Sequence, residues 1–217
     1  MSAAGNGNLA SLVAEIRETH RAREDHLRPE GDMTRRIKSV CRRLCGGDKI
    51  EAEQVYKQMM KMRKGHVEAD THANPATTAF LYCQDLLASF QALHNRRLKA
   101  EKRLVELAET LPVYPFTEAI YGMGAIGLGQ IIGEAGDLNN YPNPAKLWKR
   151  MGLGLVDGER QRKAKGALGI KMGFAPRRRA TMHVIGDSLI RKDNAYRTLY
   201  LQHKEESIKT SEQLNAP

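Results

Sequence analysis

The 217-residue sequence has few cysteines, few aromatic residues and no long apolar run, and each shortage excludes a class of protein. Its three cysteines are an odd number on segments with helical spacing, which argues against a disulfide framework. No apolar stretch approaches the roughly 20 residues of a membrane span. The beginning of the chain lacks the apolar core of a secretory signal. We therefore expect a cytoplasmic protein that contacts no membrane.

The cysteines leave one metal hypothesis open. Cys41 and Cys45 lie one helical turn apart, and His20 and His26 precede them. A zinc site is one interpretation of this spacing. The commoner interpretation is that the two cysteines are small apolar residues on one helix face, because zinc ligand pairs usually straddle a turn. We therefore predict no metal and no other cofactor.

Positive charge is concentrated in one part of the chain. The net charge is +10, and the 34 residues from 146 to 179 hold eleven cations against two anions, which is nearly the whole excess. Such clustering is typical of phosphate binding, although a solvated basic surface is the plainer alternative. The eleven cations are Lys146, Lys149, Arg150, Arg160, Arg162, Lys163, Lys165, Lys171, Arg177, Arg178 and Arg179.

Apolar spacing predicts a mainly α protein with three regions. Residues 1–70 form a helical N-terminal region with a flexible start over 1–8 and a break at 28–31, which contains Pro29 and Gly31. Residues 74–112 form one long helix, which Asn74 caps. A helix of this length extends beyond one small domain, so we expect it to pair with another helix, in a homo-oligomer.

Residues 113–210 form the third region, a helix–hairpin–helix domain with a basic loop. A short hydrophobic segment precedes a Gly-x-Gly turn, and an apolar-periodic helix over 125–135 follows it. Gly122 and Gly124 can adopt backbone angles that are closed to other residues. Together with Ala125, they place free N–H groups at the positive end of the helix dipole, where a phosphate oxygen is favoured. The basic tract that follows indicates a nucleic-acid phosphate.

The basic tract itself has little apolar periodicity. Residues 154–173 are rich in glycine and charge, so we predict a loop or irregular ribbon that orders only with a ligand. A helix beginning at Pro144 precedes this segment. A last helical region from Pro176 to about Lys209 follows it.

From about residue 96 to 204, an ordered set of short motifs resembles a known family. The pieces are Gly122-Met123-Gly124, Glu134-Ala135-Gly136-Asp137, Tyr141-Pro142, Leu147-Trp148, Gly152-Leu153, Pro176-Arg177-Arg178-Arg179 and the run from Tyr196 to Lys204. Their order and spacing are similar to the C-terminal half of insertion-sequence transposases of the 110/116/902 type. Members of this family are RNA-guided serine recombinases. The resemblance implies a role in DNA recombination or in binding mobile-element nucleic acid.

Two departures from the family bear on catalysis. The first 95 residues contain no apolar strand bearing an Asp, so the family's resolvase-like nuclease domain is missing from them. The family also places a nucleophilic Ser after its Gly-Leu helix end, whereas here no Ser occurs between Ser89 and Ser188. A serine recombinase forms a phosphoserine bond and needs that hydroxyl. We therefore assign no catalytic residue.

The prediction is a non-catalytic DNA-binding protein, nucleoid-associated in a bacterial cell. One alternative is an active transposase or recombinase subunit that uses Ser188, or uses Asp157 and Glu159 with a metal. Another is a scaffold that binds structured RNA.

Overall fold

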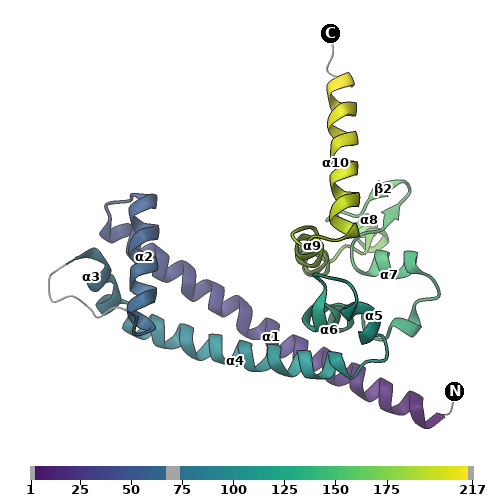
Figure 1. Cartoon of the computed structure of the whole chain (residues 1–217), viewed down its shortest axis with the longest axis horizontal. Helices are drawn as coiled ribbons and strands as arrows, with labels where there is room; N and C mark the ends of the chain where they lie inside the picture. Colours follow the sequence, from purple (N-terminus) through teal and green to yellow (C-terminus); the bar gives the residue numbers. More distant parts are fainter. Residues whose placement is uncertain (1–2, 67–73, 215–217) are drawn as a thin grey trace. The chain divides into compact units, whose positions relative to one another are not determined.

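The computed structural model describes residues 3–66 and 74–214, and the chain is mainly α-helical, as predicted (Figure 1). The only sheet within these residues has two short strands. The chain divides into two compact units. The first unit combines the described residues of 1–21 with those of 101–217, and the second unit comprises those of 22–100. The expected boundaries near residues 70 and 113 do not coincide with this division, because two helices contribute to both units.

The second unit is a helical cluster around one core. It contains the second part of α1 (Ala3–Leu44), α2 (Lys49–Arg63), α3 (Pro75–Tyr82) and the first part of α4 (Gln84–Glu109). Side chains from all four helices meet in the core, among them Ile37, Met59, Ala79 and Phe90. The Asp48 carboxylate caps α2, and the Asn74 side chain caps α3, as the sequence predicts.

The break expected at residues 28–31 is wrong, because α1 is continuous there. The helix begins at Ala3, inside the segment expected to be a flexible start, and continues through Pro29 and Gly31 to Leu44. A proline inside a helix costs about 3 kcal/mol relative to alanine, and a glycine about 1 kcal/mol. Tertiary contacts must therefore compensate for these two residues.

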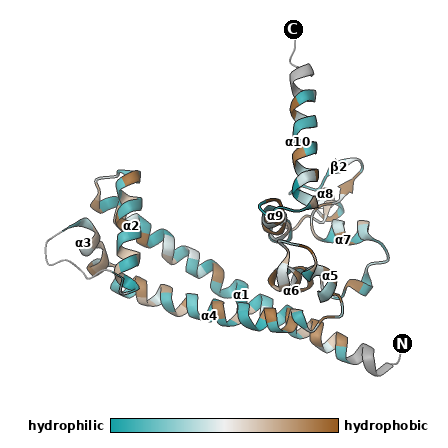
Figure 2. Cartoon of the chain, viewed as in Figure 1, coloured by the Kyte–Doolittle hydropathy of each residue, from teal (hydrophilic) through white to brown (hydrophobic). Residues whose placement is uncertain are grey.

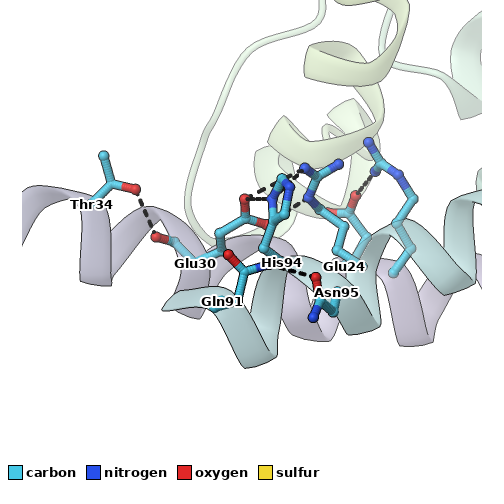
Figure 3. Close-up of polar contacts among 8 residues, drawn as sticks. Glu24, Glu30, Thr34, Gln91, His94 and Asn95 are labelled. Atoms are coloured by element: carbon cyan, nitrogen blue, oxygen red, sulfur yellow. Dashed lines mark hydrogen bonds and ion pairs between the residues drawn. The ribbon is translucent and has the colours of Figure 1, made fainter. Parts of the chain in front are cut away.

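Glu30 makes the contacts that compensate. Its carboxylate is largely buried and accepts hydrogen bonds from Arg97 Nε at 2.5 Å and from the His94 ring at 2.9 Å, both on α4 (Figure 3). The Thr34 hydroxyl donates to the Glu30 carbonyl at 3.0 Å. Burial raises the pKa of Glu30, but the hydrogen bonds and charges of Arg97 and His94 outweigh it and hold the pKa below its ordinary value. α1 and α4 are thereby joined next to the Pro-Gly site.

The predicted long helix over 74–112 is two helices. α3 ends at Tyr82, and α4 begins at Gln84 after Cys83, whose backbone leaves the helical region at φ −100° and ψ 9°. No proline or glycine marks this break, so residue type could not signal it. The buried Cys83 side chain belongs to the core of the second unit.

The apolar stripe of α4 is covered by α1 of the same chain. Hydrophobic and hydrophilic residues alternate along α4 (Figure 2). In the second unit, Leu87 shares a core with Ile37 of α1, and in the first unit Leu104 shares one with Ile16 of α1. α1 therefore supplies an intramolecular partner for these parts of the stripe, whereas Leu98 is 46% exposed, and a homo-oligomer stays a prediction.

The core of the first unit lies where α1, α4 and α6 (Gly124–Ala135) meet. It contains Val13 and Ile16 of α1, Leu107 of α4 and Leu128 of α6. α6 carries several glycines, which are poor helix formers, and Gly133 shows why one is needed. A Cβ at Gly133 would lie 2.5 Å from the His20 ring, so glycine allows α1 to approach.

The rest of the first unit consists of several short elements and two longer helices, α9 (Pro176–Ile190) and α10 (Ala195–Leu214). The short elements are α5 (Tyr114–Glu118), the 3₁₀ helix η1 (Leu138–Asn140), α7 (Pro144–Arg150), β1 (Leu155–Val156), β2 (Glu159–Arg160) and α8 (Gly166–Met172). β1 and β2 pair antiparallel, with Leu155 opposite Arg160. The segment 154–173 is therefore a hairpin and a helix, where a loop or irregular ribbon was expected, and its dependence on a ligand stays a prediction. Among the described helices, none has the length and apolar character needed to cross a bilayer.

The continuous α1 predicts a stabilising substitution. In Pro29→Ala, the free energy of unfolding should rise by about 2 kcal/mol, since the helical gain of about 3 kcal/mol is offset by about 1 kcal/mol of added freedom in the unfolded chain. Urea titration followed by circular dichroism measures this change. Arg28→Ala, at the exposed neighbouring position, should change stability by less than about 0.5 kcal/mol. Destabilisation by Pro29→Ala would show that the helix needs a break here.

Candidate functional site

The turn between α5 and α6 connects two helices, as the predicted helix–hairpin–helix requires. Gly122 has φ +106° and Gly124 has φ +56°, both in the region that favours glycine. The Met123 N–H donates to the Ile120 carbonyl at 3.0 Å and closes the turn. The predicted Gly-x-Gly geometry is therefore present.

The end of α9 and Asn194, which follows it, hold this turn in place. The Ser188 hydroxyl donates to the Gly122 carbonyl at 2.8 Å, and the Asn194 amide donates to the Tyr121 carbonyl at 2.6 Å. A Cβ at Gly122 would lie 3.0 Å from the Ser188 carbonyl oxygen, so a larger residue would push α9 away. Ser188 thus positions the turn.

The three predicted amide positions differ in their access to solvent. Gly124 is exposed, and a Cβ built there meets no atom within 4 Å. Gly122 is half-buried against α9, and Ala125 is buried. No side chain caps the beginning of α6, and the first N–H groups of a helix have no partner within it. The open part of the turn is therefore centred on Gly124.

Lys192 is a cation near this turn that sequence analysis missed. A Cβ at Gly122 would lie 3.1 Å from Lys192 Cγ, and Lys192 Nζ lies 5.3 Å from the centre of the Tyr121 ring. The predicted basic tract ends at Arg179, more than ten residues before Lys192. The adjacent cations Arg191 and Lys192, which follow α9, were the signal in the sequence that could have indicated this residue.

Glu134 forms the most buried charged cluster of the first unit. Its side chain is 1% exposed. The carboxylate contacts His20 Nε2 of α1 at 3.1 Å, Arg177 Nε of α9 at 2.6 Å and Arg178 Nε at 3.6 Å. Glu134 is the first residue of the Glu-Ala-Gly-Asp sequence. Here the residue ties α6 to two other helices.

The surroundings of Glu134 shift its pKa and that of Arg178. Burial raises the pKa of Glu134, but hydrogen bonds from His20 and Arg177, together with their charges, outweigh burial and lower it. Burial and the nearby Arg150 charge lower the pKa of Arg178. The carboxylate is therefore held in its charged form.

The basic segment folds around a buried glutamine. The Gln161 side chain is 2% exposed, donates to the Met172 carbonyl at 2.5 Å and accepts from the Gly154 N–H at 2.8 Å. Arg179 Nη1 donates to the carbonyls of Gly152 and Gln161, each at 3.3 Å. These bonds join the hairpin, α8 and α9. They give the segment a defined fold.

The eleven predicted cations separate into three groups. Arg177, Arg178 and Arg179 are engaged with Glu134 and backbone carbonyls. Lys171 and Arg162 form exposed pairs with Asp157 at 2.5 Å and with Glu159 at 3.4 Å. The other six are exposed and have no carboxylate partner in the described parts of the chain: Lys146, Lys149, Arg150, Arg160, Lys163 and Lys165.

The turn and the basic segment lie at different places along α9. Gly152 packs against Arg179, and Gly122 packs against Leu189, ten residues further along the helix. Ten residues correspond to about 15 Å along the axis and about 80° around it. A single phosphate cannot contact both sites. A nucleic-acid backbone could, because about 15 Å corresponds to roughly four base pairs at 3.4 Å each.

The residues of the catalytic alternative are engaged elsewhere. Ser188 donates to Gly122, Asp157 pairs with Lys171 and Glu159 pairs with Arg162. Nowhere in residues 3–66 or 74–214 do three or more His, Cys, Asp or Glu side chains form a group that could hold a metal ion. These contacts do not bring a nucleophile and a base together.

The cysteines of the zinc hypothesis lie in a hydrophobic core. Cys41 is buried in the second unit beside other core residues, and Cys45 packs at its margin. Burial raises the pKa of the Cys41 thiol to about 11. His20 contacts Glu134 in the first unit. The thiols thus act as small apolar side chains in the described structure.

Comparisons of the chain with protein-family models, with curated proteins and with solved structures give no match.

Glu134 predicts a pH-dependent loss of stability. Glu134→Gln should lower the free energy of unfolding by about 3 kcal/mol at neutral pH, because Arg177 and Arg178 lose their buried counter-charge. The folded-state pKa lies below the ordinary 4.5, so the stabilisation is complete above that pH and declines as the pH falls through the folded-state pKa. Urea titrations from neutral pH to below pH 4.5 should show the difference between wild type and variant shrinking on acidification.

Glu159→Gln provides the control for this measurement, because the Glu159 side chain is 64% exposed. It should change the stability little at any pH. Equal stability of wild type and Glu134→Gln at neutral pH would contradict the assigned role.

Proposed function

We propose that the first unit binds nucleic acid through its phosphates and does not catalyse strand cleavage. The observation that carries the proposal is the set of six exposed cations without carboxylate partners on α7, β2 and the segment before α8. Exposed cations that neutralise no protein carboxylate are available to phosphate oxygens. Binding then releases counterions and depends strongly on salt.

The fold of the basic segment supports this proposal. Gln161 and Arg179 fix the hairpin and α8 by hydrogen bonds to backbone carbonyls. The cations between Arg160 and Lys165 are therefore presented by an ordered scaffold. An ordered array loses less conformational freedom on binding than a flexible loop does.

The Gly124 turn provides a second contact in the proposal. Its uncapped amides and the nearby Lys192 favour one backbone phosphate. The separation of about 15 Å along α9 means that only an extended polyanion engages both contacts. Duplex DNA and structured RNA both fit this requirement, so the experiments include both.

The cation set predicts a change in salt dependence. The triple variant Arg160→Ala, Lys163→Ala, Lys165→Ala should bind a labelled DNA duplex more weakly than wild type. The slope of log affinity against log salt should fall by up to about 0.9 for each lost phosphate contact. Fluorescence anisotropy at several salt concentrations, with duplex DNA and with hairpin RNA, measures both quantities.

A control with the same loss of charge separates contacts from net charge. Lys57, Lys61 and Lys64 are exposed in the second unit, and their triple alanine variant should keep the wild-type slope. Equal effects of the two triple variants, or no binding by the wild type, would contradict the proposal.

The turn predicts a charge-specific effect at one residue. Gly124→Asp should weaken binding at least tenfold, because the carboxylate repels a phosphate at the α6 amides. Gly124→Asn is the matched control, since it has nearly the same shape and tolerates a positive φ comparably. The asparagine variant should bind within a fewfold of wild type. If both variants bind as wild type does, the turn does not contact the ligand.

A further inference from the structure

A surface pocket lies beside α7 and the beginning of the hairpin. Its lining residues are Ala145, Lys146, Trp148, Lys149, Leu153, Gly154 and Leu155, and its volume is about 530 Å³. Binding sites for small molecules fall within about 300–1,000 Å³. The pocket lies entirely within the first unit.

Trp148 is the feature of this pocket that needs an explanation. It is the only tryptophan of the chain and is 56% exposed. Leu155, which also lines the pocket, is 67% exposed. No ring partner for Trp148 occurs among the described contacts of the chain. A large apolar ring is thus left in contact with water.

The charges around the indole restrict what can cover it. Lys146 and Lys149 line the same pocket, and neither has a carboxylate partner among the described residues. No acidic residue is part of the lining. An aromatic face with cations at its edge complements a flat, π-faced group that carries negative charge beside it. A nucleotide has both features, in its base and its phosphate.

The base must be unpaired to reach the ring. In a duplex, both faces of each base are covered by its neighbours, and side chains contact only base edges and the backbone. An aromatic side chain stacks on a base face only in a single strand, a loop or a flipped nucleotide.

We infer that Trp148 stacks on an unpaired base of the bound nucleic acid, with Lys146 and Lys149 on the adjoining phosphates. This inference rests on the proposed function and specifies its ligand. The preferred partner is a single-stranded or looped segment of DNA or RNA. The other exposed cations of the basic segment contact the flanking backbone.

The single tryptophan makes its own fluorescence the test. A single-stranded thymidine oligonucleotide, a single-stranded uridine oligonucleotide and a DNA duplex of equal length are each titrated into the full chain. Both single strands should quench the emission saturably, over the same concentration range in which labelled strands gain anisotropy. The duplex should bind with much less quenching. A difference between the two single strands distinguishes DNA from RNA as the source of the base.

Variants test whether the ring itself contributes to affinity. Trp148→Ala should weaken single-strand binding about 5- to 150-fold, the range for one stacked base, and Trp148→Phe should restore most of the loss. Tyr82→Ala removes another exposed aromatic side chain, in the second unit, and should bind as wild type does. Circular dichroism confirms that each variant is folded.

Other outcomes would overturn the inference in distinguishable ways. If no oligonucleotide binds, the proposed function fails with it. If single strands bind without quenching and Trp148→Ala binds equally well, only the stacking inference fails. A blue shift of the emission with rising protein concentration, without response to oligonucleotides, would assign the pocket to a second copy and also overturn it.

Discussion

The Glu134 carboxylate is the interaction on which the first unit depends. It lies where α1, α6 and α9 meet. There the Glu134 carboxylate of α6 contacts His20 of α1 and the guanidinium groups of Arg177 and Arg178 of α9. Without Glu134, the guanidinium groups of Arg177 and Arg178 would be partly buried without a counter-charge, at a cost of several kcal/mol. Gly133, the preceding residue, leaves room for the His20 ring. One short Gly-Glu sequence therefore allows both the close approach and the charge neutralisation.

α9 connects this buried cluster to the hairpin and to the α5–α6 turn. Its first turn is held by Glu134, Arg179 then fixes the hairpin, and Ser188 near its end fixes the α5–α6 turn. The α5–α6 turn and the basic segment, which the sequence suggested were adjacent, therefore contact different parts of α9. In the proposal, a nucleic-acid backbone is long enough to contact both.

Local signals in the sequence predicted local structure well. Asp48 and Asn74 cap the helices that they were expected to cap, and the Gly122 and Gly124 turn has the expected backbone angles. Each of these features depends on a few neighbouring residues. The same holds for α7, which Pro144 begins and Gly152 follows.

The errors arose where distant residues decide the outcome. Pro29 and Gly31 signal a break, but Glu30 binds residues more than sixty positions away, and the helix continues. The contacts of Arg177 and Arg178 with the Glu134 carboxylate were not predicted either, although a phosphate-binding role for Arg177–Arg179 stays a prediction. In the same way, Lys192 was passed over because its closeness to Gly122 exists only in the folded chain. Spacing along the sequence carries no information about such contacts.

The division of the chain has a consequence for its synthesis. The first unit is built from two stretches separated by residues 22–100, which form the second unit. On a ribosome that adds about 5–20 residues per second, residue 100 is added about 2–7 seconds before α6 is complete. During that interval Val13 and Ile16 have no core to enter. Closing the intervening loop of about 80 residues costs about 4 kcal/mol of chain entropy. A second unit that folds early shortens the effective loop and lowers this cost, so it assists the assembly of its neighbour before any ligand is present.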